Sequence, residues 1–203
     1  MTRKTAIPAA VAAFLWFVMF NPWMGVQKIF WPAMAASSAI LLFFAFRSGK
    51  IRLKFDLRQI FLGVAIAAAL WGIFWLGDKI SSALFNFSRP QVDSIYAMGD
   101  GFKKWLIALQ LIFLTGPAEE LFWRGFLQQS IVDEKGPFAA MCITLAIYTL
   151  IHIWSFNFML VMAALVAGAV WGALYFLKPS WLPALVLSHA LWDAAVFVIF
   201  PII

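Results

Sequence analysis

The stretch 105–131, WLIALQLIFLTGPAEELFWRGFLQQSI, is apolar for most of its length yet carries two adjacent carboxylates and a guanidinium. A helix needs about 20 apolar residues to cross a hydrocarbon core about 30 Å thick, and this stretch is longer. Gly116-Pro117 precede the charges, so we expect the helix to kink or restart there. Glu119 and Glu120 would then lie in a first turn, where the helix dipole stabilises carboxylates.

The composition of the whole chain is that of a membrane protein. Hydrophobic residues make up 65% of the 203 residues and charged residues only 12%, whereas soluble domains carry about 25% charged residues. Apolar runs of spanning length predict an all-α, polytopic membrane fold with about seven transmembrane helices. The predicted spans are 7–23, 29–46, 60–77, 105–131, 138–154, 158–177 and 181–200.

The spans suggest one integrated membrane domain with two regions. Residues 1–104 are expected to form an N-terminal three-span region with an extracytoplasmic linker at 78–101. Residues 105–203 are expected to form the region whose spans contain ionisable side chains. Lys and Arg are retained on the cytoplasmic side, and the segment 47–58 carries five of them. We therefore expect a multi-pass protein of the cell membrane with a cytoplasmic N-terminus. Membrane lipid is the expected partner of the basic residues, and nucleic acid is not.

Ionisable side chains inside the predicted spans are few, and both histidines of the chain are among them. The set is Glu119, Glu120, Arg124, His152, His189 and Asp193. A charge at a helix centre costs on the order of 3 kcal/mol, so such groups normally pair, face a cavity and carry function. Three helices each offer a polar pair four residues apart, in which Glu120 faces Arg124, Tyr148 faces His152, and His189 faces Asp193. Glu119 is left unpaired.

These residues resemble the motifs of a known family. EELFWR fits EExxxR, YTLIH fits FxxxH with Tyr148 in place of Phe, and HALWD fits HxxxN with Asp193 in place of Asn. The order and the separate spans are also similar to those of the CAAX prenyl protease and bacteriocin-processing (CPBP, Abi-type) family of intramembrane glutamic-type endopeptidases. The resemblance covers roughly 105–200 and implies an active site in the C-terminal helical bundle.

The resemblance implies a role for each residue in peptide hydrolysis. Glu119 with His152 would position and deprotonate a water, and His189 with residue 193 would lie on the oxyanion side. Glu120 and Arg124 would hold in register the helix that carries the EExxxR motif (residues 105–131, the motif helix). Tyr148 is expected to be a supporting residue of the site. The expected substrate is a membrane-associated, prenylated or leader-bearing protein or peptide.

Other interpretations of the same residues stay open. No cofactor is expected, but Glu119, His152, His189 and Asp193 would also suit a zinc site with a position left for water. Chains of Glu, Asp and His also carry protons through membranes, which would make the protein a proton-coupled or ion transporter. A third hypothesis is a member of the family that acts as an immunity factor or scaffold without cleavage.

Overall fold

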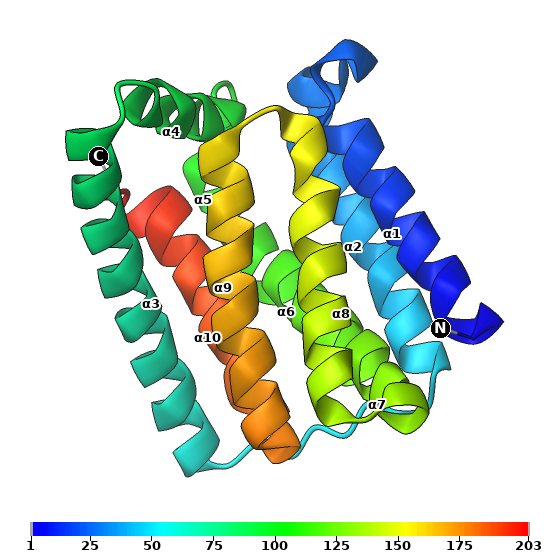
Figure 1. Cartoon of the computed structure of the whole chain (residues 1–203). Helices are drawn as coiled ribbons and strands as arrows, with labels where there is room; N and C mark the ends of the chain where they lie inside the picture. Colours follow the sequence, from blue (N-terminus) through cyan, green and yellow to red (C-terminus); the bar gives the residue numbers. More distant parts are fainter. Residues whose placement is uncertain (1, 203) are drawn as a thin grey trace.

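The fold is a bundle of helices, seen in a computed structural model that describes residues 2–202 (Figure 1). Those residues contain no strand, and seven of their helices are long and apolar enough to cross a membrane. These helices are Arg3–Phe20, Val26–Arg47, Leu57–Leu84, Lys104–Lys135, Pro137–Ser155, Phe158–Leu177 and Pro179–Ile199. Each matches a predicted span, so the all-α fold of a multi-pass membrane protein is confirmed.

Several of these spans combine α-helical segments with tighter or wider turns. The α-helical segments are α1 (Arg3–Phe20), α2 (Phe30–Arg47), α3 (Leu57–Leu84), α4 (Ser88–Tyr96), α5 (Lys104–Gln110), α6 (Gly116–Glu120), α7 (Gln129–Lys135), α8 (Pro137–Leu150), α9 (Phe158–Leu177) and α10 (Leu182–Ala194). Wider π-helical turns occupy Leu111–Thr115, Leu121–Gln128 and Ala195–Ile199, and a 3₁₀ turn, Ile151–Ser155, ends the fifth span.

The charged stretch forms a single helix from α5 through α7. The backbone at Thr115 and Gly116 is right-handed helical, and the Gly116 N–H reaches the Leu111 carbonyl in a π turn just before Pro117. The wider turn accommodates the proline, so the predicted restart does not occur. Glu119 does fall in the first turn of α6, but α6 continues α5 and has no free N-terminus. The expected help from a helix dipole is therefore absent.

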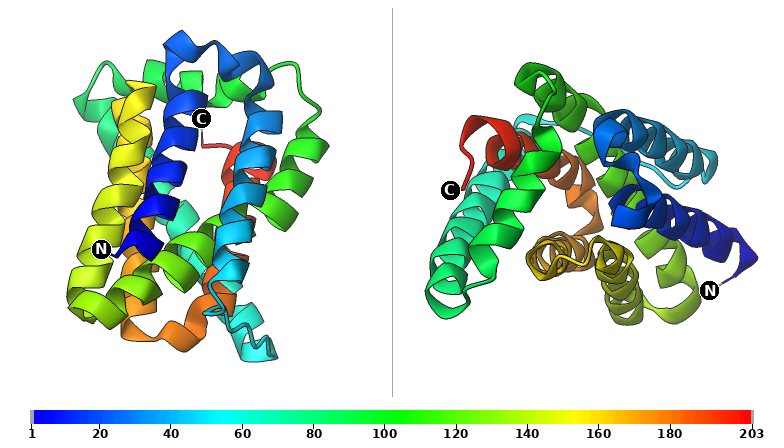
Figure 2. Two further views of the ribbon diagram at one scale, coloured as in Figure 1. Left: turned by 90° about the vertical axis from the view of Figure 1, so that its right-hand side faces the viewer. Right: turned by 90° about the horizontal axis from the view of Figure 1, so that it is seen from above.

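The length of this helix is accommodated by tilt. Its 32 residues extend about 48 Å at 1.5 Å per residue, well beyond the hydrocarbon core. Figures 1 and 2 show it crossing the bundle obliquely behind α8 and α9. Its middle, which carries the charges, therefore lies inside the bundle, where all residues from Ala118 to Gln128 are buried.

The last span lies at the centre of the bundle and α3 at its edge. In its apolar window 67% of residues are buried, against 22% in α3. α10 packs against both α3 and α6. The approach to α6 is close, because a Cβ added at Gly116 would lie 2.7 Å from the backbone N and Cα of Ala190. Glycine at position 116 thus lets the two helices with ionisable residues touch.

The connection at 78–101 is more helical than the sequence suggested. α3 continues to Leu84, so Asp78 lies on this helix, buried, with its carboxylate 3.1 Å from Nη1 of Arg89. Arg89 and Pro90 lie in the first turn of α4. The predicted span 60–77 therefore ended too early and left out a charged residue of α3. Figure 1 shows α4 lying across one end of the bundle.

Candidate active site

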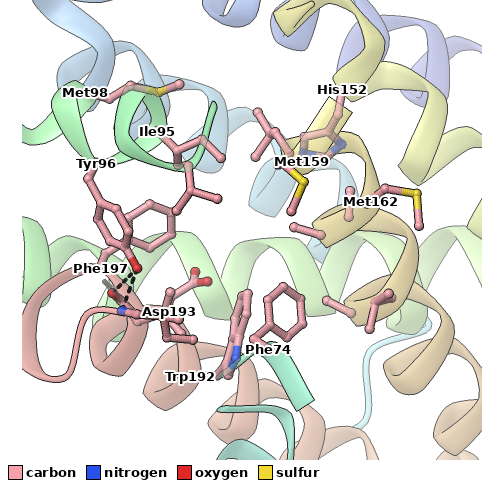
Figure 3. Close-up of a pocket in the computed structure, with 18 of the residues that line it drawn as sticks. Phe74, Ile95, Tyr96, Met98, His152, Met159, Met162, Trp192, Asp193 and Phe197 are labelled. Carbon is pink, nitrogen blue, oxygen red and sulfur yellow. Dashed lines mark hydrogen bonds between the residues drawn. The ribbon is translucent and has the colours of Figure 1, made fainter. Parts of the chain in front are cut away.

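A cavity of about 420 Å³ lies between the helices on the side of α4. Its wall is mostly apolar, with Phe74, Met159, Met162 and Trp192 among the side chains drawn in Figure 3. The polar side chains that line it are Asp78, Ser81, Tyr96, Thr115, Glu119, Tyr148, His152, His189 and Asp193. The fold thus brings the four predicted catalytic residues and Tyr148 to one cavity. Glu120 and Arg124 are not part of its wall.

Glu119 is a buried carboxylate that forms no ion pair within residues 2–202. Its side chain is buried, lines the cavity, and its Oε2 atom has no hydrogen-bond partner within residues 2–202. Tyr148, from α8, interacts with the same carboxylate. A buried polar atom without a partner is rare, because the cost of removing it from water is not recovered. A water or a substrate donor that entered beside this oxygen would satisfy it, because Glu119 lies in the cavity wall.

Glu120 links the predicted Glu120–Arg124 pair to His189 of the predicted His189–Asp193 pair. Its Oε1 accepts from Nη1 of Arg124 at 2.8 Å, as the spacing predicted, and also from Nδ1 of His189 at 2.9 Å. Arg124 also donates to the carbonyl of Gly168 and lies over the ring of Tyr148, 4.9 Å from its centroid. These fully buried groups join the motif helix to α8, α9 and α10, so Glu120 orients a cavity residue as well as its own helix.

His189 and Asp193 lie one turn apart on α10, and both face the cavity (Figure 3 shows the carboxyl of Asp193). Nε2 of His189 is 3.5 Å from Oδ2 of Asp193, longer than an ordinary hydrogen bond. The imidazole stacks on Trp171 at 3.9 Å, and Trp171 is itself tied to Ser188. Glu120 and Trp171 thus hold the ring, while its Nε2 edge is directed toward Asp193.

His152 has both ring nitrogens engaged. Nδ1 donates to the carbonyl of Tyr148 at 2.8 Å, and Nε2 accepts from the indole N–H of Trp16 at 3.1 Å. Since a carbonyl only accepts and an indole only donates, the imidazole is neutral with its proton on Nδ1. The predicted Tyr148–His152 pairing exists, but through the backbone of Tyr148. Trp16, fully buried on α1, thus belongs to the site.

Sequence reasoning missed Trp16 and Asp78. Trp16 lies in an apolar run in which every neighbour is also hydrophobic, so no spacing marks it. The Nε1–H donor is the only polar feature of its side chain. Asp78 was assigned to a linker because the apolar run of the third span ends at Gly77. Only the continuation of α3 places it in the cavity wall.

One end of the cavity is closed by α4 and the residues after α10. The hydroxyl of Tyr96 donates to the carbonyl of Val196 and accepts from the N–H of Ile202, as Figure 3 shows with dashed lines. Burial raises the pKa of Tyr96 above its ordinary value, so the phenol stays neutral and can make both bonds. Ile202 is itself buried and lines the cavity.

The four residues considered for zinc do not present a ready set of ligands. Within residues 2–202, no group of three or more His, Cys, Asp or Glu side chains is arranged to hold a metal ion. The ring nitrogens of His152 are held by Tyr148 and Trp16, and Nδ1 of His189 is held by Glu120. Zinc ligation through His152 would require one of these bonds to break.

Residues 101–195 match the model of a protein family described as "Rce1-like: Type II CAAX prenyl endopeptidase Rce1-like". The matched segment contains all the ionisable residues of the site apart from Asp78 and Tyr96. No curated protein and no solved structure matches the chain significantly. Over this segment, just under half of the chain, the protein is similar to the Rce1-like family of type II CAAX prenyl endopeptidases, a family of CAAX-type intramembrane proteases.

Proposed function

We propose that this protein is an intramembrane endopeptidase that cleaves a peptide bond near the end of a membrane-associated, prenylated or leader-bearing protein or peptide. The observation that carries the proposal is the carboxylate of Glu119, which is buried, opens on an apolar cavity and has one oxygen without a partner in the described chain. Such an oxygen is suited to hold the water that attacks the peptide bond.

Glu119 acts as the general base. It takes a proton from the water while the oxygen of that water attacks the carbonyl carbon, and then passes the proton to the leaving amine. Neighbouring Tyr148 can donate a hydrogen bond to the carboxylate and so fix its orientation. The step needs one base and one water.

We assign to His152 the positioning of this water through the face of its ring, because the ring lies in the same cavity wall as Glu119 and both of its nitrogens are bonded to protein groups. The ring is held at both nitrogens, which makes it a rigid neutral group. Trp16 is a positioning residue in this account, since it touches His152 and holds its imidazole. The first helix would therefore contribute to catalysis through a single buried hydrogen bond.

His189 and Asp193 are assigned to the oxyanion that forms on the substrate carbonyl. An Nε2–H of His189, or a protonated carboxyl of Asp193, can donate to that oxygen. Glu120 and Arg124 do not touch the substrate. Glu120 accepts a hydrogen bond from His189 and is itself paired with Arg124, so this buried ion pair, next to Glu119 in the sequence, fixes the position of His189.

The cavity favours an uncharged, apolar stretch of substrate. No lysine or arginine from the described residues lines it, and Phe, Trp and Met side chains make up much of its wall. An anionic group would find no lysine or arginine there and would face the carboxyl groups of Glu119, Asp193 and Asp78. These features suit the hydrophobic end of a membrane protein, and they do not select between a prenyl group and apolar side chains.

We propose that the water is activated by Glu119 without a metal. The support is the engagement of the histidine nitrogens by protein groups and the absence of a metal-ligand cluster in residues 2–202. Zinc bound to the purified protein in stoichiometric amount, and lost together with turnover on chelation, would overturn this part of the proposal.

Peptide mass spectrometry of membranes tests the function. Membranes with the protein should contain a shortened form of at least one membrane-associated protein, together with its released fragment, and membranes with Glu119→Gln should contain neither. If the two sets of peptides are identical while proton or ion flux differs, the protein is a transporter. If neither differs, the family member does not cleave.

A further inference from the structure

The end of the bundle opposite α4 carries most of the basic residues. Figure 1 shows the connection between α2 and α3 at this end, beside α7. By the order of the spans, nine Lys and Arg lie here and five at the α4 end. Those nine are Arg3, Lys4, Arg47, Lys50, Arg52, Lys54, Arg58, Lys135 and Lys178. Each end has three carboxylates, so the excess charge is confined to one face.

Residues 50–56, which we call the basic strap, alternate basic and apolar side chains. Lys50, Arg52 and Lys54 alternate with Ile51, Leu53 and Phe55 along a segment without helix or strand. Ile51 anchors the strap to the motif helix, because its Cδ1 would lie 2.7 Å from a Cβ added at Gly125. Leu53 and Phe55 are 39% and 53% exposed. Exposed apolar side chains beside cations are typical of a segment in the membrane interface.

A hollow of about 520 Å³ lies between the strap and the turn that follows α9. The three cations of the strap line it, and no carboxylate of the described chain does. Its other lining residues are Gly49, Gln129, Tyr175, Pro179, Ser180 and Leu182. The hydroxyl of Tyr175 donates to Oε1 of Gln129 at 2.8 Å. The amide nitrogen of Gln129 is thereby left as the donor of that side chain.

Two cations of the hollow have no counter-charge. Lys50 is paired with Asp133. Arg52 and Lys54 form no ion pair or side-chain hydrogen bond with any part of residues 2–202. Cations that converge on a hollow without a carboxylate favour an anion, and phosphate oxygens accept well from guanidinium and ammonium groups.

We propose that this hollow binds the phosphate of an anionic membrane lipid, with Arg52 and Lys54 as the main ligands. The strap's position at the edge of the spanning helices and the exposed Leu53 and Phe55 favour a lipid over a soluble phosphate. The acyl chains would lie along the outer face of the bundle beside these two side chains. The site is at the opposite end of the molecule from the catalytic cavity and does not depend on the proposed protease activity.

Lipid counting by native mass spectrometry tests this site. The full chain is purified, stripped of lipid and titrated with phosphatidylglycerol or with phosphatidylcholine of the same acyl chains. Arg52→Gln with Lys54→Gln should weaken the first phosphatidylglycerol by roughly thirtyfold, since each basic group near an anionic lipid contributes about a factor of five. Phosphatidylcholine should bind weakly to all forms.

The matched control is Lys103→Gln with Lys104→Gln, which removes the same charge from exposed residues at the α4 end. It should change the affinity less than about twofold. Equal losses in the two double variants, or equal affinity for the two lipids, would overturn the proposal. So would displacement of the lipid by inorganic phosphate at a similar concentration, because the occupant would then be a soluble phosphate. Lys54→Gln alone, with a smaller loss, provides the same test if the double variant is unstable.

Discussion

Replacing Trp16 by Phe tests the bond that ties the first helix to the candidate active site. The change keeps an aromatic ring in a fully buried position, removes the N–H that donates to His152 at 3.1 Å, and makes the side chain smaller, an effect that a second Trp→Phe variant controls for. A buried acceptor left without its partner costs about 1 to 3 kcal/mol. If that energy orients the imidazole for catalysis, turnover should fall by about 5- to 150-fold.

Selective ¹⁵N labelling of histidine gives a direct assay, because the chain has only two histidines. The Nε2 signal of His152 should move toward the value of a free imine nitrogen in Trp16→Phe, and the signals of His189 should stay in place. Trp123→Phe is the matched control, since Trp123 is equally buried, packs edge-on against Trp16 and has an indole N–H without a partner in the described chain. An unchanged Nε2 signal in Trp16→Phe would refute the bond. A rise in turnover would mean that Trp16 blocks His152 instead of holding it.

Three further predictions concern stability, the oxyanion side and orientation. Arg124→Ala should lower the thermal stability and the abundance of the protein by the equivalent of about 3 to 5 kcal/mol, because Glu120 is left as an uncompensated buried charge; normal abundance would contradict the buried pair. Asp193→Asn should keep much of the activity, since Asn can donate and is nearly isosteric, and chelators should leave the unmutated enzyme active; loss of activity together with bound zinc would favour the metal site. A reporter that works only in the cytoplasm should be active at Lys50 and inactive after Ile203, which lies outside the described residues; the reverse pattern would invert the proposed topology in the cell membrane.

The fold could be predicted from the sequence largely because the bilayer restricts the solutions. Uninterrupted apolar runs of spanning length have to become helices, and all seven did. Local breaks were less informative. Gly116-Pro117 predicted a kink or a restart, and the helix does not restart because the π turn at Leu111–Thr115 accommodates the proline. Asp78 and Lys79 predicted the end of a span, but α3 continues to Leu84 because Arg89 supplies a partner for the carboxylate.

The candidate site was predictable where its partners lie on one helix. The pairing of Glu120 with Arg124 follows from a spacing of four residues, and the structure contains it. Contacts between helices were not predictable in the same way. The bond from His189 to Glu120 depends on the close approach at Gly116, and the bond from Trp16 to His152 joins residues 136 apart. The division of the chain at residue 104 stays a prediction.

The central claim is that Glu119 activates a water to cleave a peptide bond, and one comparison tests it most directly. Purified protein carrying Glu119→Gln is compared with Asp100→Asn, the same carboxylate-to-amide change at an exposed turn, on a substrate identified from the membrane peptides. In ¹⁸O-labelled water, the unmutated protein and Asp100→Asn should produce a fragment whose new C-terminus carries one ¹⁸O atom. Glu119→Gln should do so at least about a hundredfold more slowly, the usual contribution of a general base. Full turnover by Glu119→Gln at equal abundance would contradict the account.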